Sequence, residues 1–335
     1  MKSTEFKFKL QLFADFPNTV VKTTNTAPHD MSPTMKTFYD TALLENSRET
    51  NVFSQFAKKQ PMKGNKVEWR KFDKFEKATT PIQEGVIPTG SDFGMTKIEA
   101  DVNQYGDYTT VSDRLKMEAY DDVIFGATEE MGAAMGETRG VLTRNAISTG
   151  TSVWFAGNKT ERGQLTADDK LTDTLVNKAA TWLKKNGAPK INGSYIAFIH
   201  PCVAEDLRES DGWKDAHKYA AVKELFNGEI GELHGIRFIE TNEARITQDG
   251  ALIEEGGTAH HSVFETLFFG KDAYGEPEPE GEGQEMIIKP ASVIGGPLEQ
   301  FSTIGYKFCH AAKILYQERI LRMITSSSYN TESAN

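Results

Sequence analysis

The sequence is poor in cysteine and has no long apolar run. Its 335 residues include two cysteines, Cys202 and Cys309, and the mean hydropathy is −0.48. Two cysteines supply neither a disulfide framework nor a cysteine-only zinc site. No segment approaches the roughly 18 apolar residues of a membrane span, and lysines interrupt the first nine residues where a signal peptide needs an apolar stretch. We therefore expect a soluble chain from a reducing compartment, with no membrane partner.

Motifs that carry chemistry are also absent. The sequence has no H-E-x-x-H or C-x-x-C metal spacing, no G-x-S-x-G nucleophile motif and no Walker sequence. His260 and His261 are adjacent, so on a strand they point to opposite faces. Cys202 opens a predicted helix, where a buried and unreactive thiol is expected. We expect no catalytic, cofactor-binding or metal-binding residue, and no enzyme activity.

An acidic run between Gly275 and Gly283 reads Glu-Pro-Glu-Pro-Glu-Gly-Glu. It lacks the spacing of a calcium-binding loop. Because it is rich in proline and negative charge, we interpret it as a solvated loop.

Charge is distributed unevenly along the chain. The formal net charge is −10, yet residues 1–77 hold 14 Lys/Arg and 9 Asp/Glu, a net of +5. The remaining residues hold 24 and 39, a net of −15. Opposite blocks of charge can serve solubility, nucleic-acid binding or binding to the acidic part of another copy. Composition does not choose among these.

The first third of the chain lacks the pattern of a compact domain. Residues 6–13 alternate, which predicts a short strand or an extended arm, and residues 15–30 read as a tether before a helix that starts near Ser32. Two strand-like runs, 66–75 and 96–111, flank a connection rich in proline and glycine, and Gly106 is expected to form a bulge. Connections of this length are usually functional. An isolated hairpin is only marginally stable in water, so we expect this one to lie on another surface.

The rest of the chain predicts helices and buried strands. Residues 121–149 contain no proline and place apolar residues at three- and four-residue steps, which predicts one long helix. The residues expected to pack it are Ile124, Met131, Met135 and Leu142. From 170 to 290 the pattern is α/β, with strands at 195–199, 236–239 and 263–269 and a helix from Pro201. Residues 306–324 alternate around a turn near 317–318.

Aromatic and basic side chains are interleaved from Trp69 to Phe75. Three interpretations stay open for this segment. It could stack on single-stranded nucleic acid, it could be a strand whose aromatics pack on its own protein, or it could lie across another subunit. We favour the third because a hairpin of this length cannot bury its own aromatics.

Several short motifs occur in a recognisable order: Ser32–Asp40, Lys71–Asp73 with Ala78–Pro81 and Glu84–Val86, Gln104–Tyr108 with Ser112-Asp113, Phe269–Gly275, and Gly305–Lys307. In this order the chain resembles the major capsid proteins of tailed bacteriophages, in particular a podophage-type subfamily. Leu10–Ala14 also resembles a leader found in coat or scaffold proteins of phages of Gram-positive hosts. An N-terminal extension of about 30 residues departs from the family pattern.

The resemblance implies an α+β architecture, the tailed-phage major capsid fold. It divides the chain into an N-terminal arm (1–61), an extended β-hairpin loop (62–115), and a peripheral domain (116–169) whose long spine helix spans about 121–149. An α/β axial domain (170–290), peripheral-domain return strands (291–325) and a polar tail (326–335) follow.

The resemblance also implies a function and partners. The chain would self-assemble into hexamers and pentamers of an icosahedral shell around double-stranded phage DNA, with scaffold and portal proteins as further partners. The DNA would be near the shell without sequence-specific contact. The protein would reside in the virion capsid after assembly in the cytoplasm of the host bacterium. Contacts between subunits are expected through the arm and the extended loop, at Phe6, Phe8, Leu10, Leu12, Trp69, Arg70, Lys71, Phe72, Lys74, Phe75, Ile82, Val86 and Ile87.

Two alternatives remain. A shell-forming compartment protein could use the same fold without a phage, and a nucleic-acid-binding protein could use the basic and aromatic patch at 66–77.

Overall fold

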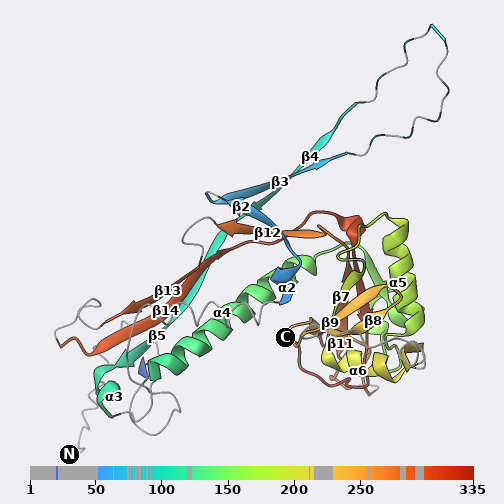
Figure 1. Cartoon of the computed structure of the whole chain (residues 1–335). Coiled ribbons are helices and arrows are strands. Elements are labelled where there is room, and N and C mark those ends of the chain that lie inside the picture. Colours follow the sequence, from blue (N-terminus) through green and yellow to red (C-terminus); the bar gives the residue numbers. More distant parts are fainter. Residues whose placement is uncertain are drawn as a thin grey trace, which may run out of the picture. The chain divides into compact units, whose positions relative to one another are not determined.

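The computed structural model describes residues 20–21, 52–62, 64–73, 92–118, 123–210, 212–214, 229–254, 257–279, 284–290 and 298–335, and positions 75, 77, 79, 81, 84, 85, 87 and 90. The chain forms two compact units (Figure 1). Unit 1 draws on 1–47, 104–135 and 284–308, and unit 2 on 48–103, 136–283 and 309–335. The strand expected at 6–13 and the helix expected near Ser32 lie outside the described residues.

Unit 1 is built on a four-stranded sheet with the order β1-β5-β14-β13. Its strands are β1 (Val20–Val21), β5 (Asn103–Ser112), β14 (Phe301–His310) and β13 (Gln284–Lys289). Helix α3 (Asp113–Glu118) follows β5, and α4 (Val123–Ile147) contributes residues to both units. Val111, Leu115 and Ile304 form the small apolar core of unit 1.

Two glycines allow β5 and β14 to lie unusually close together. A Cβ at Gly106 would lie 2.5 Å from the carbonyl oxygen of Tyr306, and one at Gly305 would lie 2.7 Å from the Cβ of Tyr108. Both distances are shorter than any ordinary contact, so neither position accommodates a side chain. β5 continues through Gly106, where the bulge stays a prediction, and the predicted strand is interrupted at Val102.

Unit 2 holds a seven-stranded sheet with the order β6-β16-β11-β7-β9-β8, and β10 pairs with β11. The strands are β6 (Val153–Phe155), β16 (Ile320–Thr325), β11 (Val263–Phe269), β7 (Tyr195–Ile199), β9 (Ile236–Glu240), β8 (Glu229–Leu233) and β10 (Ile246–Thr247). Helices α5 (Asp173–Lys185) and α6 (Pro201–Glu209) accompany this sheet. The strands predicted at 195–199 and 263–269 and the helix start at Pro201 are confirmed.

Smaller elements complete unit 2. A three-stranded sheet has the order β15-β12-β2, and β3 and β4 form a separate pair. The bounds are α2 (Val52–Gln55), β2 (Lys58–Met62), β3 (Lys66–Phe72), β4 (Met95–Asp101), β12 (Tyr274–Pro279) and β15 (Lys313–Ile314). Short 3-10 helices occupy Ala156–Asn158, Arg162–Gln164 and Gln317–Arg319, the last at the predicted turn.

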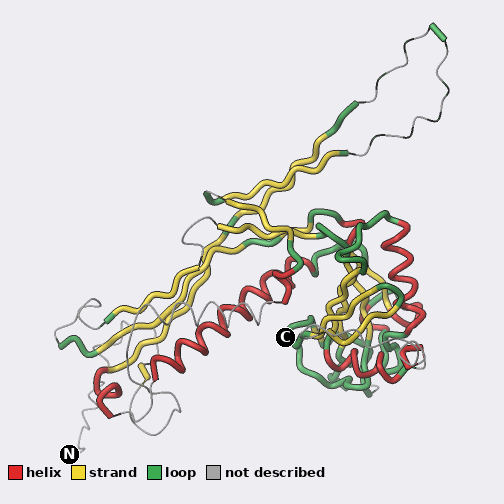
Figure 2. Tube along the Cα trace, in the orientation of Figure 1, coloured by secondary structure: helices red, strands yellow, loops and turns green. Residues whose placement is uncertain are grey.

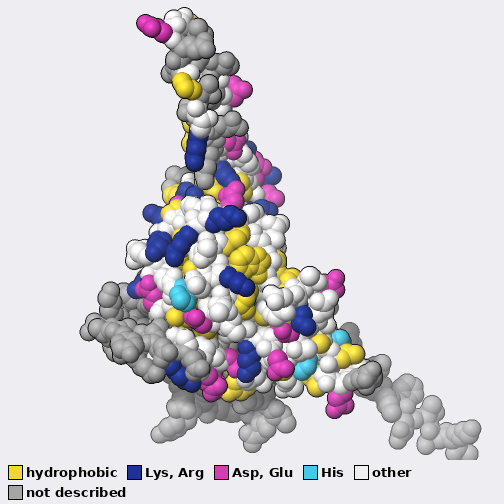
Figure 3. Space-filling model, turned by 90° about the vertical axis from the view of Figure 1, so that its right-hand side faces the viewer, with side chains coloured by type: hydrophobic (Ala, Val, Ile, Leu, Met, Phe, Trp, Pro, Cys, Tyr) yellow, Lys and Arg dark blue, Asp and Glu magenta, His cyan; other side chains and the backbone are white. Residues whose placement is uncertain are grey.

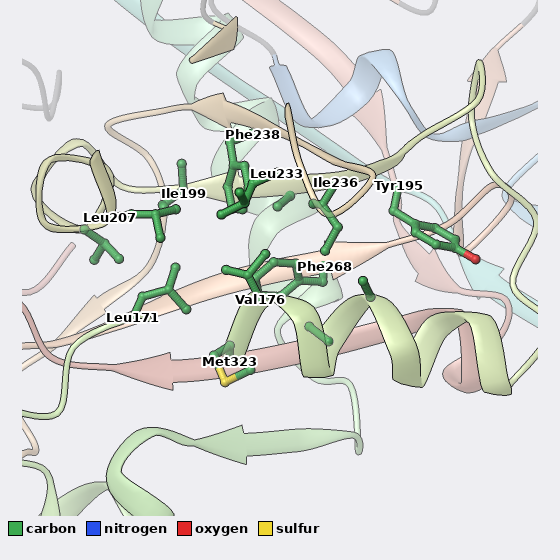
Figure 4. Packing of buried hydrophobic residues seen from close by; sticks show 14 of the residues in the cluster. Leu171, Val176, Tyr195, Ile199, Leu207, Leu233, Ile236, Phe238, Phe268 and Met323 are labelled. Carbon is green, nitrogen blue, oxygen red and sulfur yellow. The ribbon is translucent and has the colours of Figure 1, made fainter. Parts of the chain in front are cut away.

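Helix α5 and the large sheet share the main apolar core. Val176, Ala179, Ala180 and Leu183 lie on one face of the helix and are fully buried. Figure 4 shows Val176 beside Phe268 of β11, with Phe238 and Met323 from neighbouring strands. The helix ends where sequence rules place the end, with lysines in the last turn and Gly187 in the left-handed region at φ 69°.

The polar segment 326–335 packs onto unit 2. Ser326 and Ser327 are fully buried, and the Asp206 carboxylate accepts hydrogen bonds from Ser327 Oγ at 2.6 Å and Ser328 N at 2.8 Å. The Asn335 side chain accepts from Arg144 Nη1 of α4 at 2.9 Å. This segment therefore stabilises the sheet region although its composition alone indicated a tail.

We expect Phe268→Ala to lower the free energy of unfolding by about 4 kcal/mol. The ring is fully buried and meets Phe238 edge to face at 6.2 Å, so its removal leaves a cavity. Denaturant unfolding followed by near-ultraviolet circular dichroism measures this. Leu252→Ala is the matched control because Leu252 is largely exposed, and its expected change is below about 0.5 kcal/mol. Equal losses in both variants would contradict this packing.

Candidate functional site

The hairpin of β3 and β4 is the most distinctive element of unit 2. The two strands pair antiparallel from Lys66 opposite Asp101 to Phe72 opposite Met95. The ladder continues one step further through a hydrogen bond from Asp73 N to Gly94 O at 3.0 Å. Figure 2 shows the pair as a long two-stranded ribbon. The second predicted strand is divided, because β4 pairs with β3 whereas β5 belongs to the sheet of unit 1.

Three phenylalanines form an exposed stack along the far half of this hairpin. The Phe93 ring lies 5.0 Å from Phe72 and 5.3 Å from Phe75, with interplanar angles of 21° and 20°. Each of the three side chains remains 58–60% exposed. We call this set the phenylalanine stack. Exposed apolar surface of this kind marks an interaction site. Because the rings are already ordered by stacking, binding would cost them less conformational entropy.

The near half of the hairpin is buried by its own chain. Trp69 is 5% exposed and packs in a cluster with Met62, Val67 and Leu315. Its indole lies flat against Gly275 of β12, where a Cβ would come within 2.9 Å of the ring. The expectation that the hairpin cannot bury its aromatics is therefore wrong for Trp69. The glycine at 275 leaves the space, and Trp69 is not available to stack on a base or a neighbouring subunit.

The other predicted contact residues are distributed between exposed, paired and undescribed positions. Arg70 donates to Glu68 at 2.8 Å, and Lys71 lies over the Tyr316 ring at 4.7 Å. Ile87 is 93% exposed. Phe6, Phe8, Leu10, Leu12, Lys74, Ile82 and Val86 lie outside the described residues.

Glu276 lies at the base of the hairpin and corrects the interpretation of the acidic run as a solvated loop. Residues 274–279 form strand β12, which pairs in parallel with β2 from Gly275 opposite Lys58 to Pro279 opposite Met62. The Glu276 side chain is 0% exposed. A buried carboxylate is costly unless it is paired and hydrogen-bonded, so its partners are decisive.

Both oxygens of the Glu276 carboxylate are fully occupied. Oε1 accepts from Ser54 Oγ at 2.7 Å and Thr143 Oγ1 at 2.6 Å. Oε2 accepts from Lys59 Nζ at 2.9 Å and Arg139 Nη2 at 3.2 Å. These partners come from α2, β2 and α4, so one carboxylate joins three elements to β12.

His310 completes this arrangement, which we call the Glu276 cluster (Ser54, Lys59, Arg139, Thr143, Glu276 and His310). Its Nε2 lies 3.1 Å from Thr143 Oγ1. The Thr143 hydroxyl has one hydrogen, which is directed at Glu276, so we assign the donated proton of this contact to His310 Nε2. β14 is thereby joined to the same carboxylate through Thr143.

The electrostatics of the cluster follow from burial and from two cations. Burial alone would raise the pKa of Glu276, but Lys59 and Arg139 outweigh it and hold the pKa at about 2. Burial lowers the pKa of His310 to about 4, against the opposing effect of Glu276. The cluster therefore holds an ionised Glu276 and a neutral His310 at neutral pH.

The residues expected to pack helix α4 are only part of its contacts. Met135 is buried and Met131 and Leu142 are half-buried; the side chain of Ile124 lies outside the described residues. Arg139 and Thr143, which bind Glu276, were not identified from the sequence. A period of four links Met135, Arg139 and Thr143, and this polar pair inside an apolar stripe was the available signal.

No other candidate for chemistry emerges. Within the ranges that the structure describes, no group of three His, Cys, Asp or Glu side chains could hold a metal ion. Burial raises the pKa of the Cys202 thiol, which makes it less reactive. Of the helices described, none combines the length and apolar character needed to cross a membrane.

We expect Glu276→Gln to lower the free energy of unfolding by about 3 kcal/mol at neutral pH, because Lys59 and Arg139 lose their buried counter-charge. Urea unfolding measures this. Glu278→Gln is the control: it lies on the same strand but is exposed, so its effect is expected to stay below about 0.5 kcal/mol. A Glu276→Gln chain as stable as the control would overturn the role assigned to the carboxylate.

Stability is expected to fall as the pH is lowered from about 6.5 to about 4. In this window the unfolded chain binds a proton on His310 that the folded chain excludes, because the folded pKa is about 4 against an ordinary 6.5. The full effect is about 3 kcal/mol. Burial also lowers the pKa of His200, so the diagnostic is the difference between wild type and His310→Gln, which should lose part of the slope. If stability depended on pH equally steeply in wild type and His310→Gln, the role assigned to His310 would be refuted.

Comparison with known proteins gives one family and one fold. The sequence model described as phage capsid protein matches residues 130–276. No curated protein matches the chain as a relative.

Solved structures similar to the whole chain include two phage capsids. The capsid of cyanophage P-SCSP1u is 16% identical, with a TM-score of 0.64 over 91% of this chain and 93% of that chain. The capsid of Ralstonia phage GP4 is 14% identical, with a TM-score of 0.65 over 97% and 98%. The virus-like particle from Pyrococcus furiosus is 12% identical, with a TM-score of 0.50 over 84% and 96%. The mixed α+β architecture is thus the tailed-phage major capsid fold, and residues 130–276 within it match the phage capsid protein model.

Proposed function

We propose that this chain is the major capsid protein whose hexamers and pentamers form an icosahedral shell around double-stranded DNA. The observation that carries the proposal is the phenylalanine stack, an exposed apolar surface on a hairpin whose base is fixed by Trp69 and the Glu276 cluster. The family match and the fold support a role in self-association.

The hairpin suits this role because its two halves have different tasks. The near half is buried on its own subunit, which fixes the position of the ladder. The far half exposes rings whose burial by another subunit would stabilise the contact by roughly 25 cal/mol per Å² of apolar surface. Because the rings already stack on one another, their side chains would lose little conformational entropy on binding.

We propose that the expected contacts of the arm and loop act together with this stack. The arm would contribute Phe6, Phe8, Leu10 and Leu12, and the loop Ile82, Val86 and Ile87. Scaffold and portal proteins and packaged DNA are the further partners, and assembly takes place in the cytoplasm of the host bacterium. In this proposal the protein has no catalytic role.

A second candidate is a shell-forming compartment protein with the same fold. Its support is the likeness to the virus-like particle from Pyrococcus furiosus. The contents of purified particles discriminate the two: nucleic acid inside favours the capsid, and a protein cargo favours the compartment. The nucleic-acid-binding alternative through 66–77 is weaker, since Trp69 is buried.

We expect Phe93→Asp to prevent particle formation while the chain remains folded. The charge would be placed at the centre of the phenylalanine stack, where a neighbouring subunit would have to bury it. Sedimentation velocity and negative-stain imaging measure assembly, and circular dichroism checks the fold.

Leu252→Asp is the control, since Leu252 is 45% exposed and is not part of the hairpin strands. It should assemble as wild type does. Normal shells from Phe93→Asp would remove the stack from the interface, and a wild-type chain that stays monomeric at high concentration with scaffold present would contradict the proposed function.

A further inference from the structure

One stretch of this acidic protein carries only positive charge. Between Thr174 and Ala204 there are four lysines and no Asp or Glu, although residues 78–335 hold a net charge of −15. The stretch covers helix α5 apart from its first residue, Asp173, and continues through the turn after it and strand β7 to the start of α6. Such segregation has to be explained by where these side chains lie.

The lysines of α5 lie on its solvent face. Lys178, Lys184 and Lys185 are exposed, whereas Val176 and Leu183 on the opposite face are fully buried. Lys184 and Lys185 also lie in the last turn, where cations interact favourably with the helix dipole. That effect does not account for Lys178, which lies in the middle of the helix.

Two further lysines join this face through the turn that follows α5. Lys190 is exposed at the end of the turn, and Lys271 is exposed on the loop after β11. The two loops are tied together, because Lys271 N donates to Pro189 O at 2.8 Å. Arg319 Nη1 donates to Lys271 O at 3.0 Å and adds another cation beside them. We call Lys178, Lys184, Lys185, Lys190 and Lys271 the lysine face.

The charges of the lysine face are not neutralised within the chain. Across the part of the chain that the structure describes, none of its five ammonium groups forms an ion pair with a carboxylate. Of the acidic groups near these lysines along the chain, Asp173 contacts His234 at 2.7 Å, and Asp272, which directly follows Lys271, is half-buried. On the side of unit 2 on which α5 lies, Figure 3 shows dark blue side chains together with yellow hydrophobic ones, and magenta acidic side chains lower on the same face.

The composition of this face indicates what kind of partner it fits. A protein interface needs a desolvated centre with aromatic or apolar anchors, and lysine is depleted there. None of the large exposed apolar side chains among the described residues falls between Thr174 and Lys190. Binding to a phosphate backbone needs only cations, and lysine supplies point charges without the paired geometry by which arginine reads a base.

We propose that the lysine face binds the phosphate backbone of double-stranded DNA without reading its sequence. The inference rests on the proposed function, since it identifies the surface through which the shell meets its contents. It also assigns an orientation: the exposed face of α5 lines the interior of the shell.

The test compares two variants that lose the same charge. Lys184→Gln/Lys185→Gln/Lys190→Gln removes three cations from the lysine face. Lys214→Gln/Lys289→Gln/Lys313→Gln removes three exposed lysines, from the segment after α6, from β13 and from β15. Binding of the unassembled full chain to a fluorescent duplex of mixed sequence is measured by anisotropy over a range of salt concentrations. Particle formation is imaged separately for each protein.

We expect the lysine-face variant to bind DNA at least about tenfold more weakly at low salt and to reduce the salt slope by about 2 to 3, since each phosphate contact contributes about 0.9. The control variant should bind as wild type does, and both should form shells. Unchanged binding, or equal losses in both variants, would overturn the inference. So would normal DNA binding with loss of shells, which would make the face a contact between proteins. DNA binding by a wild-type chain that never forms shells would instead refute the proposed function.

Discussion

The burial of one carboxylate governs how the hairpin is held. Glu276 has no contact with water, so its charge is stable only while Lys59, Arg139, Ser54 and Thr143 remain around it. These partners come from α2, β2 and α4. Buried ion pairs are weak sources of stability but strict about geometry. The cluster therefore fixes where β2, α4 and β12 lie against one another at Glu276.

The contrast between a buried near half and an exposed far half of the hairpin explains why the exposed rings need not cause unspecific association. Apolar side chains on a flexible loop would invite unspecific association. On a ladder whose near half is buried by Trp69, Met62 and Val67, the same rings are presented in one arrangement. In the proposed function, specific self-association would follow from rigidity at the base of the hairpin and apolar surface beyond it.

Sequence patterns predicted the elements whose apolar residues form a continuous run or a helical repeat. The strands at 195–199 and 263–269 are fully buried runs, and the helix of α4 shows its spacing over many turns, so these were found with their bounds close to the observed ones. The predictions failed where a contact with a residue distant in the sequence determines the local structure or the burial of a side chain. Gly275 makes room for Trp69, and Tyr306 excludes a side chain at Gly106; neither partner is visible in local composition. The acidic run around Glu276 was misjudged for the same reason, because its cations come from residues 59 and 139.

The parallel pairing of β2 with β12 also determines the order in which parts of the chain can fold during synthesis. Gly275 pairs with Lys58, so the two strands are separated by most of the sequence, and contacts between such distant residues form late in folding. Until β12 has left the ribosome, β2 has no partner for its ladder and Lys59 has no carboxylate to bind. A nascent chain thus exposes its hairpin without a fixed base until β12 has been synthesised and has paired with β2.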